Sequence, residues 1–218
     1  MSLHYENIYR GIFLRRLNRF IAEVEVDGAV CKAHVRNTGR CTAVISPGAE
    51  ISLQRNSDPA RKTAWTLIAV NTAEYGWVNL DSLAPNKISG EWLEFQGFQH
   101  IRPEYHFGES RIDFCAERGG ELYLIEVKGC TLEQNGVGLF PDAPTSRGAK
   151  HLRELAGAAG KGYRSAIAFV IMLNGITEVQ PNSEIDPEFA AEFANALAAG
   201  VEAYFISCRC TADEVLLM

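Results

Sequence analysis

Alternation of apolar and polar residues marks the first part of the chain as a set of short strands. Over residues 20–27 an apolar side chain recurs at every second position, which is the period of a strand with one buried face. Asp27-Gly28 is a hairpin turn signal, and a second apolar run follows it at 30–35. So many short strands close together predict a small barrel of the OB or SH3 type. Further strands are expected after the turn segments 37–39 and 46–48, and at 65–71 and 76–80.

From residue 83 onward the pattern mixes strands and helices, which predicts a mixed α/β domain. The last helix has the clearest limits, because Asp186-Pro187 supplies an N-cap with a first-turn proline and Gly200 ends the periodicity. We therefore divide the chain into an N-terminal barrel, residues 1–82, and a C-terminal α/β domain, residues 83–218. In the second part we expect strands at 110–116, 121–128, 165–173 and 201–206, a helix at 146–159, and a short helix within 82–95.

Charge is distributed unevenly between these two parts. The 218 residues include 21 Lys and Arg against 27 Asp and Glu, which gives a net charge of -6. Residues 1–82 carry 10 basic and 8 acidic residues, whereas residues 83–218 carry 11 basic and 19 acidic residues. An acidic total argues against a nucleic-acid partner, but here it averages a mildly basic barrel with an acidic second domain. A nucleic-acid partner therefore stays open, with binding that is centred on a local patch.

Neither an export signal nor a membrane span is visible in the sequence. The longest apolar run, at 166–173, is far shorter than the roughly 20 residues needed to cross a bilayer. We expect a cytoplasmic protein without a membrane partner, and we interpret its six cysteines as reduced thiols. Cys208 and Cys210 form an isolated C-x-C pair, which is a weak metal signal and favours a structural role.

The residues best suited to chemistry lie on one predicted hairpin. Gly119-Gly120 is a candidate two-residue turn, and that turn places Asp113 opposite Glu126 and Arg111 opposite Lys128. All four side chains then share one face, because side chains alternate along a strand. Directly opposed carboxylates repel each other and destabilise a sheet unless a cation lies between them.

A divalent metal would resolve this repulsion. Asp113 and Glu126 offer hard oxygen ligands that suit Mg²⁺ or Mn²⁺, with Glu109 as a further ligand or base. Lys128 would position or help to deprotonate a water and would offset charge at a scissile phosphate. The alternative is a solvated hairpin face with diagonal salt bridges, because Glu-x-Lys alone is a common pattern.

Two groups of basic residues are candidates for contacting phosphates. On the helix at 146–159, a basic face lies opposite the leucines and includes His151, which we interpret as a surface histidine. On the barrel, the segment FLRRLNRF at 13–20 places three arginines and two phenylalanines together, and basic groups with interleaved aromatics are how OB-type barrels hold single strands. Solvated arginines over a phenylalanine core are the equal alternative. The candidate nucleic-acid-binding residues are Arg15, Arg16, Arg19, Arg111, Arg147 and Lys150.

At these residues the chain resembles the sugar fermentation stimulation protein family, SfsA. The resemblance covers most of the length and is carried above all by two long blocks, IEVKGCTL at 125–132 and GVGLFPDAPTSRGAKHLREL at 136–155. The stretch 80–98 departs most from the family pattern, and Ile112 stands where a literal PD motif would have proline. Shorter matches are NTG at 37–39, PG at 47–48, SDPARK at 57–62 and SRIDF at 110–114.

This resemblance implies an OB-like domain joined to a domain of the PD-(D/E)xK nuclease fold, a two-domain chain of the α/β (α+β) class. It further implies largely sequence-nonspecific DNA binding and a link to sugar (maltose) metabolism. By position, Asp113, Glu126 and Lys128 match the acidic residue and the (D/E)-x-K pair of that fold.

Two function classes follow. One is a Mg²⁺- or Mn²⁺-dependent nuclease acting on DNA, with RNA as an open alternative. The other is a DNA-binding regulator that keeps the fold without turnover. A carbohydrate-binding module is suggested by the family name alone.

Overall fold

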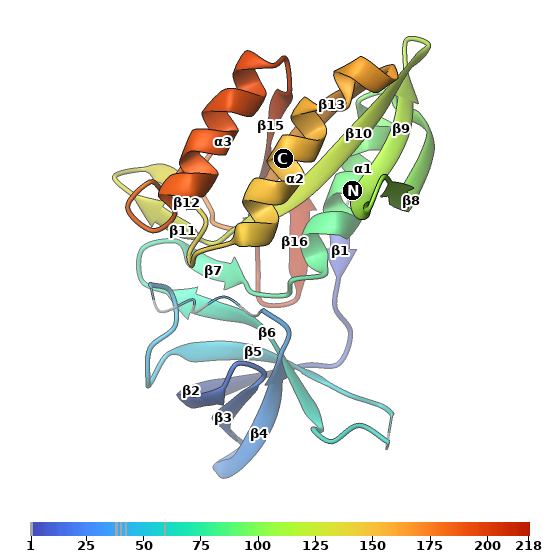
Figure 1. Ribbon diagram of the computed structural model, residues 1–218. Helices are drawn as coiled ribbons and strands as arrows, with labels where there is room; N and C mark the ends of the chain where they lie inside the picture. The colour runs from blue at the N-terminus through green and yellow to red at the C-terminus, as the bar shows by residue number, and fades with distance from the viewer. Residues whose placement is uncertain (1, 38, 40, 42, 59) are drawn as a thin grey trace.

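The computed structural model describes residues 2–37, 39, 41, 43–58 and 60–218. Figure 1 shows two parts, with most of the N-terminal strands gathered in one body and the three helices in the other. No helix in the described part of the chain is long and apolar enough to cross a membrane. All six cysteines are described and free, and Cys208 and Cys210 are buried at 3% exposure each.

The first part is a closed five-stranded barrel, as the strand pattern predicts. Its strands are antiparallel neighbours in the order β4-β3-β2-β5-β6, and a parallel pairing of β4 with β6 closes the ring. Asp27 and Gly28, between β3 and β4, both have positive φ, at 52° and 77°, which a tight two-residue hairpin turn requires. The strands are β2 (Ile8–Asn18), β3 (Ile21–Val26), β4 (Ala29–Val35), β5 (Glu50–Arg55) and β6 (Trp65–Thr72), with β7 (Gly76–Asn79) paired to β6.

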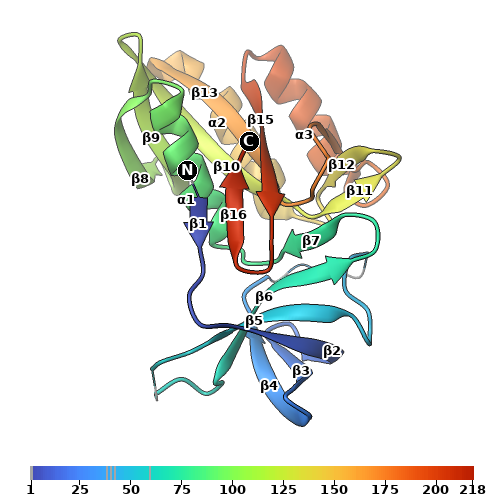
Figure 2. The same cartoon turned by 180° about the vertical axis from the view of Figure 1, so that it is seen from behind.

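The second part is built on a seven-stranded mixed sheet in the order β1-β16-β15-β13-β10-β9-β8. Helix α1 (Ala84–Phe95) lies on one face, and α2 (Ser146–Ala156) and α3 (Pro187–Ala198) lie on the other (Figures 1 and 2). The strands are β1 (Ser2–His4), β8 (Gln99–Phe107), β9 (Ser110–Arg118), β10 (Glu121–Cys130), β13 (Tyr163–Ile171), β15 (Glu202–Cys210) and β16 (Glu214–Leu217). A small sheet joins β11 (Leu132–Gln134), β12 (Val137–Phe140) and β14 (Val179–Pro181), and a 3-10 turn spans Ala159–Lys161.

The helix limits follow from local capping. The Asp186 side chain accepts a hydrogen bond from the Phe189 amide at 2.9 Å, so α3 begins where the sequence predicts. Thr145 caps α2 in the same way, accepting from the Gly148 amide at 3.0 Å. Phe193 then packs on Phe169 of β13, and Phe189 packs on Phe193 and on Phe140, which fixes α3 against the sheet.

The N-terminal strand crosses from one domain to the other, which the division at residue 82 does not anticipate. β1 pairs antiparallel with β16, with Ser2 opposite Leu216 and His4 opposite Glu214. The start of the chain therefore belongs to the sheet of the second domain and covers the edge of β16. An unpaired edge strand leaves backbone donors and acceptors exposed, which is the physical reason for this addition.

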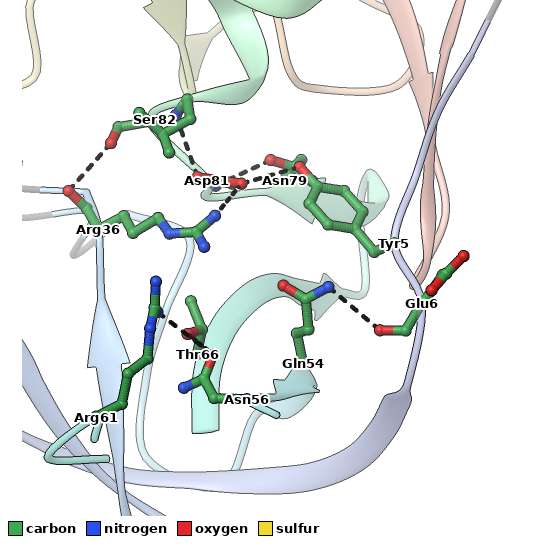
Figure 3. Close-up of polar contacts among 11 residues, drawn as sticks. Tyr5, Glu6, Arg36, Gln54, Asn56, Arg61, Thr66, Asn79, Asp81 and Ser82 are labelled. Atoms are coloured by element: carbon green, nitrogen blue, oxygen red, sulfur yellow. Dashed lines mark hydrogen bonds and ion pairs between the residues drawn. The ribbon is translucent and has the colours of Figure 1, made fainter. Parts of the chain in front are cut away.

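A buried carboxylate joins the two domains at the point where the chain passes between them (Figure 3). Asp81, 3% exposed, forms an ion pair of 2.7 Å with Arg36, which follows β4. The Tyr5 hydroxyl donates to the same carboxylate at 3.3 Å, and Asn79 donates to that hydroxyl at 3.2 Å. Asp81 also accepts from the Leu83 amide at 3.1 Å, immediately before α1 begins. One side chain thus ties the barrel, the N-terminal segment and α1 together.

We predict that Asp81→Ala destabilises the protein by about 3 kcal/mol or more, because it leaves the Arg36 guanidinium and the Tyr5 hydroxyl without their buried acceptor. Urea unfolding at neutral pH measures this loss. The matched control is Glu23→Ala, which removes the carboxylate partner of the exposed Arg15 and should cost about 1 kcal/mol or less. Equal losses in the two variants would contradict the role assigned to Asp81.

Candidate metal centre

The hairpin β9-β10 has the predicted register over half of its length and then opens. Leu122 faces Glu117 and Ile125 faces Phe114, but the ladder ends with that last pair. Beyond that pair, the Val127 amide donates to the Asp113 side chain at 2.8 Å. In a regular ladder this amide would donate to a backbone carbonyl. Asp113 and Glu126 are therefore neighbours but not a cross-strand pair, which corrects the expected geometry.

Opening of the ladder also separates Arg111 from Lys128, which were expected to lie opposite each other. Arg111 is exposed and forms an ion pair of 2.6 Å with Glu104 of β8. Lys128 instead turns to Glu126 on its own strand, with 2.5 Å between its ammonium nitrogen and Oε1. The hairpin face is thus divided between an exposed pair and a largely buried one.

Asp113 is held between a helix and a strand. Asn86, in the first turn of α1, donates to its Oδ1 at 2.8 Å, while Val127 donates to its Oδ2. Burial raises the pKa of Asp113 above its ordinary value, and the negative charge of Glu126 adds to this. The two carboxylates therefore lie close enough for each to oppose ionisation of the other.

Glu126 is 3% exposed and uses its two oxygens differently. Its Oε1 takes both the Lys128 ammonium and the Nδ1 atom of His151. Its Oε2 is buried and contacts no donor in the described part of the chain. Burial opposes ionisation, but Lys128 and His151 together outweigh it and hold the pKa of Glu126 below its ordinary value.

His151 is the residue that sequence reasoning placed wrongly. It is buried at 3% exposure and lies against Glu126, so it is not a surface histidine. Arg147, one turn earlier on α2, donates to its Nε2 at 3.4 Å. The helical periodicity that places His151 on the same face as Arg147 was a sequence signal for their contact. No sequence signal indicated the contact of Asn86 with Asp113, because that contact depends on where α1 packs.

The remaining candidates are dispersed. Glu109 is exposed, and among the described residues no three His, Cys, Asp or Glu side chains come together as a metal-binding group. The role of Glu109 as a further ligand stays a prediction. On α2, Arg147 and Lys150 are exposed, and Lys150 lies 3.7 Å from Glu154.

The three barrel arginines have three different environments. Arg15 is exposed and pairs with Glu23 at 2.8 Å. Arg16 donates to backbone carbonyls, at 2.7 Å to Gly39 and 2.5 Å to Asn37, and so holds a loop in place. Arg19 is exposed and forms no ion pair with any described residue. Arg19 is thus the arginine of the three that is best placed to contact a partner.

The carboxylates fit a hard divalent cation. The unpartnered Oε2 of Glu126 is buried, where an orphaned anionic oxygen is costly. Each Asp113 oxygen accepts one hydrogen bond and keeps a further lone pair. Two carboxylates with waters completing the coordination shell are a usual arrangement for Mg²⁺.

Comparison with known proteins agrees with both halves of this architecture. A family model described as the SfsA N-terminal OB domain matches residues 14–80, and one described as the sugar fermentation stimulation protein RE domain matches residues 83–214. The chain belongs to the SfsA family. A sugar fermentation stimulation protein homolog of Desulfitobacterium hafniense is 44% identical over 98% of this chain and 94% of its own length. One of Ruminiclostridium cellulolyticum is 40% identical over 94% of this chain and 92% of its own length.

A solved SfsA structure has the same fold. The structure of Pyrococcus furiosus SfsA in complex with Ca²⁺ superposes with a TM-score of 0.88 at 28% identity, over 99% of this chain and 95% of that one. The OB-like barrel and its attached mixed-sheet domain are therefore features of this SfsA chain as well as of its relatives.

We predict that Lys128→Met costs about 3 kcal/mol of stability at pH 7, because it removes the cation from a buried carboxylate. The pKa of Glu126 is depressed in the folded state, so this contribution is present at neutral pH and disappears as the pH falls below about 4. Urea unfolding of wild type and variant at a series of pH values from 7 downward measures how this stability difference disappears. The control, Lys150→Met, removes an exposed i,i+4 partner of Glu154 and should change stability by about 0.5 kcal/mol or less at every pH.

Proposed function

We propose that this SfsA protein is a Mg²⁺- or Mn²⁺-dependent phosphodiesterase that acts on DNA, with Asp113 and Glu126 as the metal ligands. The observation that carries the proposal is that Oε2 of Glu126 is buried and has no hydrogen-bond partner among the described residues. The negative charge of Glu126 also helps to raise the pKa of Asp113, the second carboxylate. Support comes from the Pyrococcus furiosus relative, whose complex contains Ca²⁺. Ca²⁺ and Mg²⁺ both select oxygen ligands.

A bound divalent cation would acidify a water nucleophile and stabilise charge on the scissile phosphate. Lys128 contributes a fixed positive charge there. Its ammonium is held in an ion pair with Glu126, so it has no lone pair with which to accept a proton. We therefore assign Lys128 to stabilisation of developing negative charge rather than to deprotonation of water.

Phosphates flanking the reacting one need cations at the edge of this centre. Arg147 is exposed on α2, and its guanidinium contacts His151. His151 in turn contacts Glu126, so the Arg147 guanidinium lies near the proposed metal ligands. Lys150 lies one turn of helix away, and its pairing with Glu154 at 3.7 Å is loose and exposed. Both can approach a nucleic-acid backbone without breaking a buried contact.

The second candidate function is DNA binding without turnover, in a regulator of sugar metabolism. The observation that favours it is that the described residues contain no group of three His, Cys, Asp or Glu side chains that could hold a metal ion, although His151 contacts Glu126. A metal held by two carboxylates depends more heavily on waters and substrate, and it is bound more weakly.

Cleavage of DNA and RNA in Mg²⁺ or Mn²⁺ separates the two functions. We predict metal-dependent cleavage that falls by about 100-fold or more in Glu126→Gln and in Lys128→Met. Glu104→Gln, which neutralises an exposed carboxylate on β8, is the matched control and should cleave normally. Absence of cleavage under every condition, with DNA binding unchanged in the variants, would leave the regulator as the function.

Metal binding itself provides a pH test. Bound metal requires ionised carboxylates, and the raised pKa of Asp113 means that protonation competes at a higher pH than for an ordinary aspartate. We predict that Mn²⁺ affinity, measured by calorimetry, is constant near neutral pH. On acidification it should begin to fall at a pH above about 4, the ordinary pKa of an aspartate. Glu126→Gln should bind Mn²⁺ at least about tenfold more weakly at neutral pH. An affinity that is unchanged in this variant would remove Glu126 from the metal site.

A further inference from the structure

A groove runs between the two domains and begins at the candidate metal centre. One cavity, of about 140 Å³, is lined by Asn86 and Val127, the two residues that hold Asp113. A second, of about 290 Å³, extends to Arg19 on the barrel. The two cavities share Asn37, Gly129 and Thr131 in their lining. The two cavities therefore adjoin at these residues, and together they reach from Asn86 and Val127, which hold Asp113, to Arg19 on the barrel.

Close backbone approach shapes this groove. A Cβ atom on Gly129 would lie 2.8 Å from Cγ of Pro85, so only glycine lets the end of β10 pass the start of α1. On the barrel side, a Cβ atom on Gly39 would lie 2.4 Å from Oδ2 of Asp142. The barrel loop therefore meets the second domain at Asp142, and both domains contribute to the wall.

The lining of the larger cavity suits a nucleobase better than a phosphate. Asp142 places a carboxylate there, which repels phosphate and accepts hydrogen bonds from base amino and imino groups. Asn37 and Thr131 add polar groups, and Phe140 and Pro141 add an apolar wall. The guanidinium of Arg19 at the barrel end forms no ion pair with any described residue, and it provides the cation that a backbone phosphate needs. Next to it, Phe20 leaves 49% of its surface exposed, where a base can stack.

From these contacts we propose that the groove between the domains binds unpaired nucleotides of a nucleic-acid strand, with a base against Asp142 and Phe140 and a phosphate on Arg19. Cavities of about 140 and 290 Å³ have the scale of a single base, and they exclude a base-paired duplex, whose base edges face each other. This inference rests on the proposed function for its substrate, and it specifies that the strand which reaches the metal centre is single-stranded or locally unpaired.

The test measures binding separately from cleavage. A short labelled strand of mixed sequence and the same sequence as a duplex are titrated in EDTA by fluorescence polarisation. We expect the single strand to bind at least about tenfold more tightly than the duplex. Ala143→Trp, which fills the larger cavity, should reduce single-strand affinity by about tenfold or more. Ala73→Trp fills a different cavity on the barrel that shares no residue with the groove, and it should change nothing.

Two arginines provide a test that does not depend on how the tryptophan variant folds. Arg19→Ala should weaken single-strand binding and reduce its salt slope by about one. Arg15→Ala removes the same charge from an arginine that is engaged with Glu23, and it should leave the slope unchanged. Equal binding of duplex and single strand, or an unaffected Arg19→Ala, overturns the inference. Mn²⁺ binding by wild type and Glu126→Gln is measured in parallel, so a failed metal centre and a failed groove give different results.

Discussion

The buried carboxylate of Asp81 is the interaction on which the rest of the structure depends. It neutralises Arg36 at the end of the barrel, accepts from Tyr5 on the N-terminal segment and holds the backbone amide that precedes α1. Asn86, in the first turn of that helix, then reaches Asp113. The orientation of a candidate metal ligand is thus set by a contact at the domain boundary. Asp81 also lines the smaller cavity at the domain boundary.

The half-buried Asp113 and the buried Glu126 lie on neighbouring strands, and their negative charges are stabilised by different partners. Asp113 takes two neutral donors, one of them the Val127 amide that the opened ladder leaves free. Glu126 takes a cation and a histidine on a single oxygen. The result is asymmetric: the pKa of Asp113 is raised and that of Glu126 is lowered. Within the described part of the chain, the buried Oε2 of Glu126 has no hydrogen-bond donor, so a cation bound at this oxygen would be stabilised.

Shared architecture across the family does not by itself define an activity, because one fold hosts binding proteins and enzymes alike. The similarity to Pyrococcus furiosus SfsA at 28% identity and a TM-score of 0.88 shows that the two-domain arrangement is retained at large sequence distance. In this chain the proposed chemistry depends on the side chains at the open end of the β9-β10 hairpin. The proposed strand-binding groove lies at the junction of the domains, and both domains contribute residues to its lining.

The sequence by itself determined the elements whose signals are local. Asp27-Gly28 predicts its hairpin because both residues tolerate positive φ, and Asp186-Pro187 predicts the start of α3 because capping involves neighbours in the chain. Asp113, Glu126 and Lys128 were singled out because strand alternation and a glycine turn predicted one shared face, although the ladder ends before it reaches them. Tertiary structure alone decided what requires distant contacts: the transfer of β1 to the second sheet, the burial of His151 against Glu126, and the role of Asn86. It also distinguished the barrel arginines: Arg15 pairs with Glu23 and Arg16 donates to loop carbonyls, whereas Arg19 forms no ion pair with any residue that the structure describes. Local periodicity carries no information about such partners, because they lie on segments whose separation in sequence is unrelated to their separation in space.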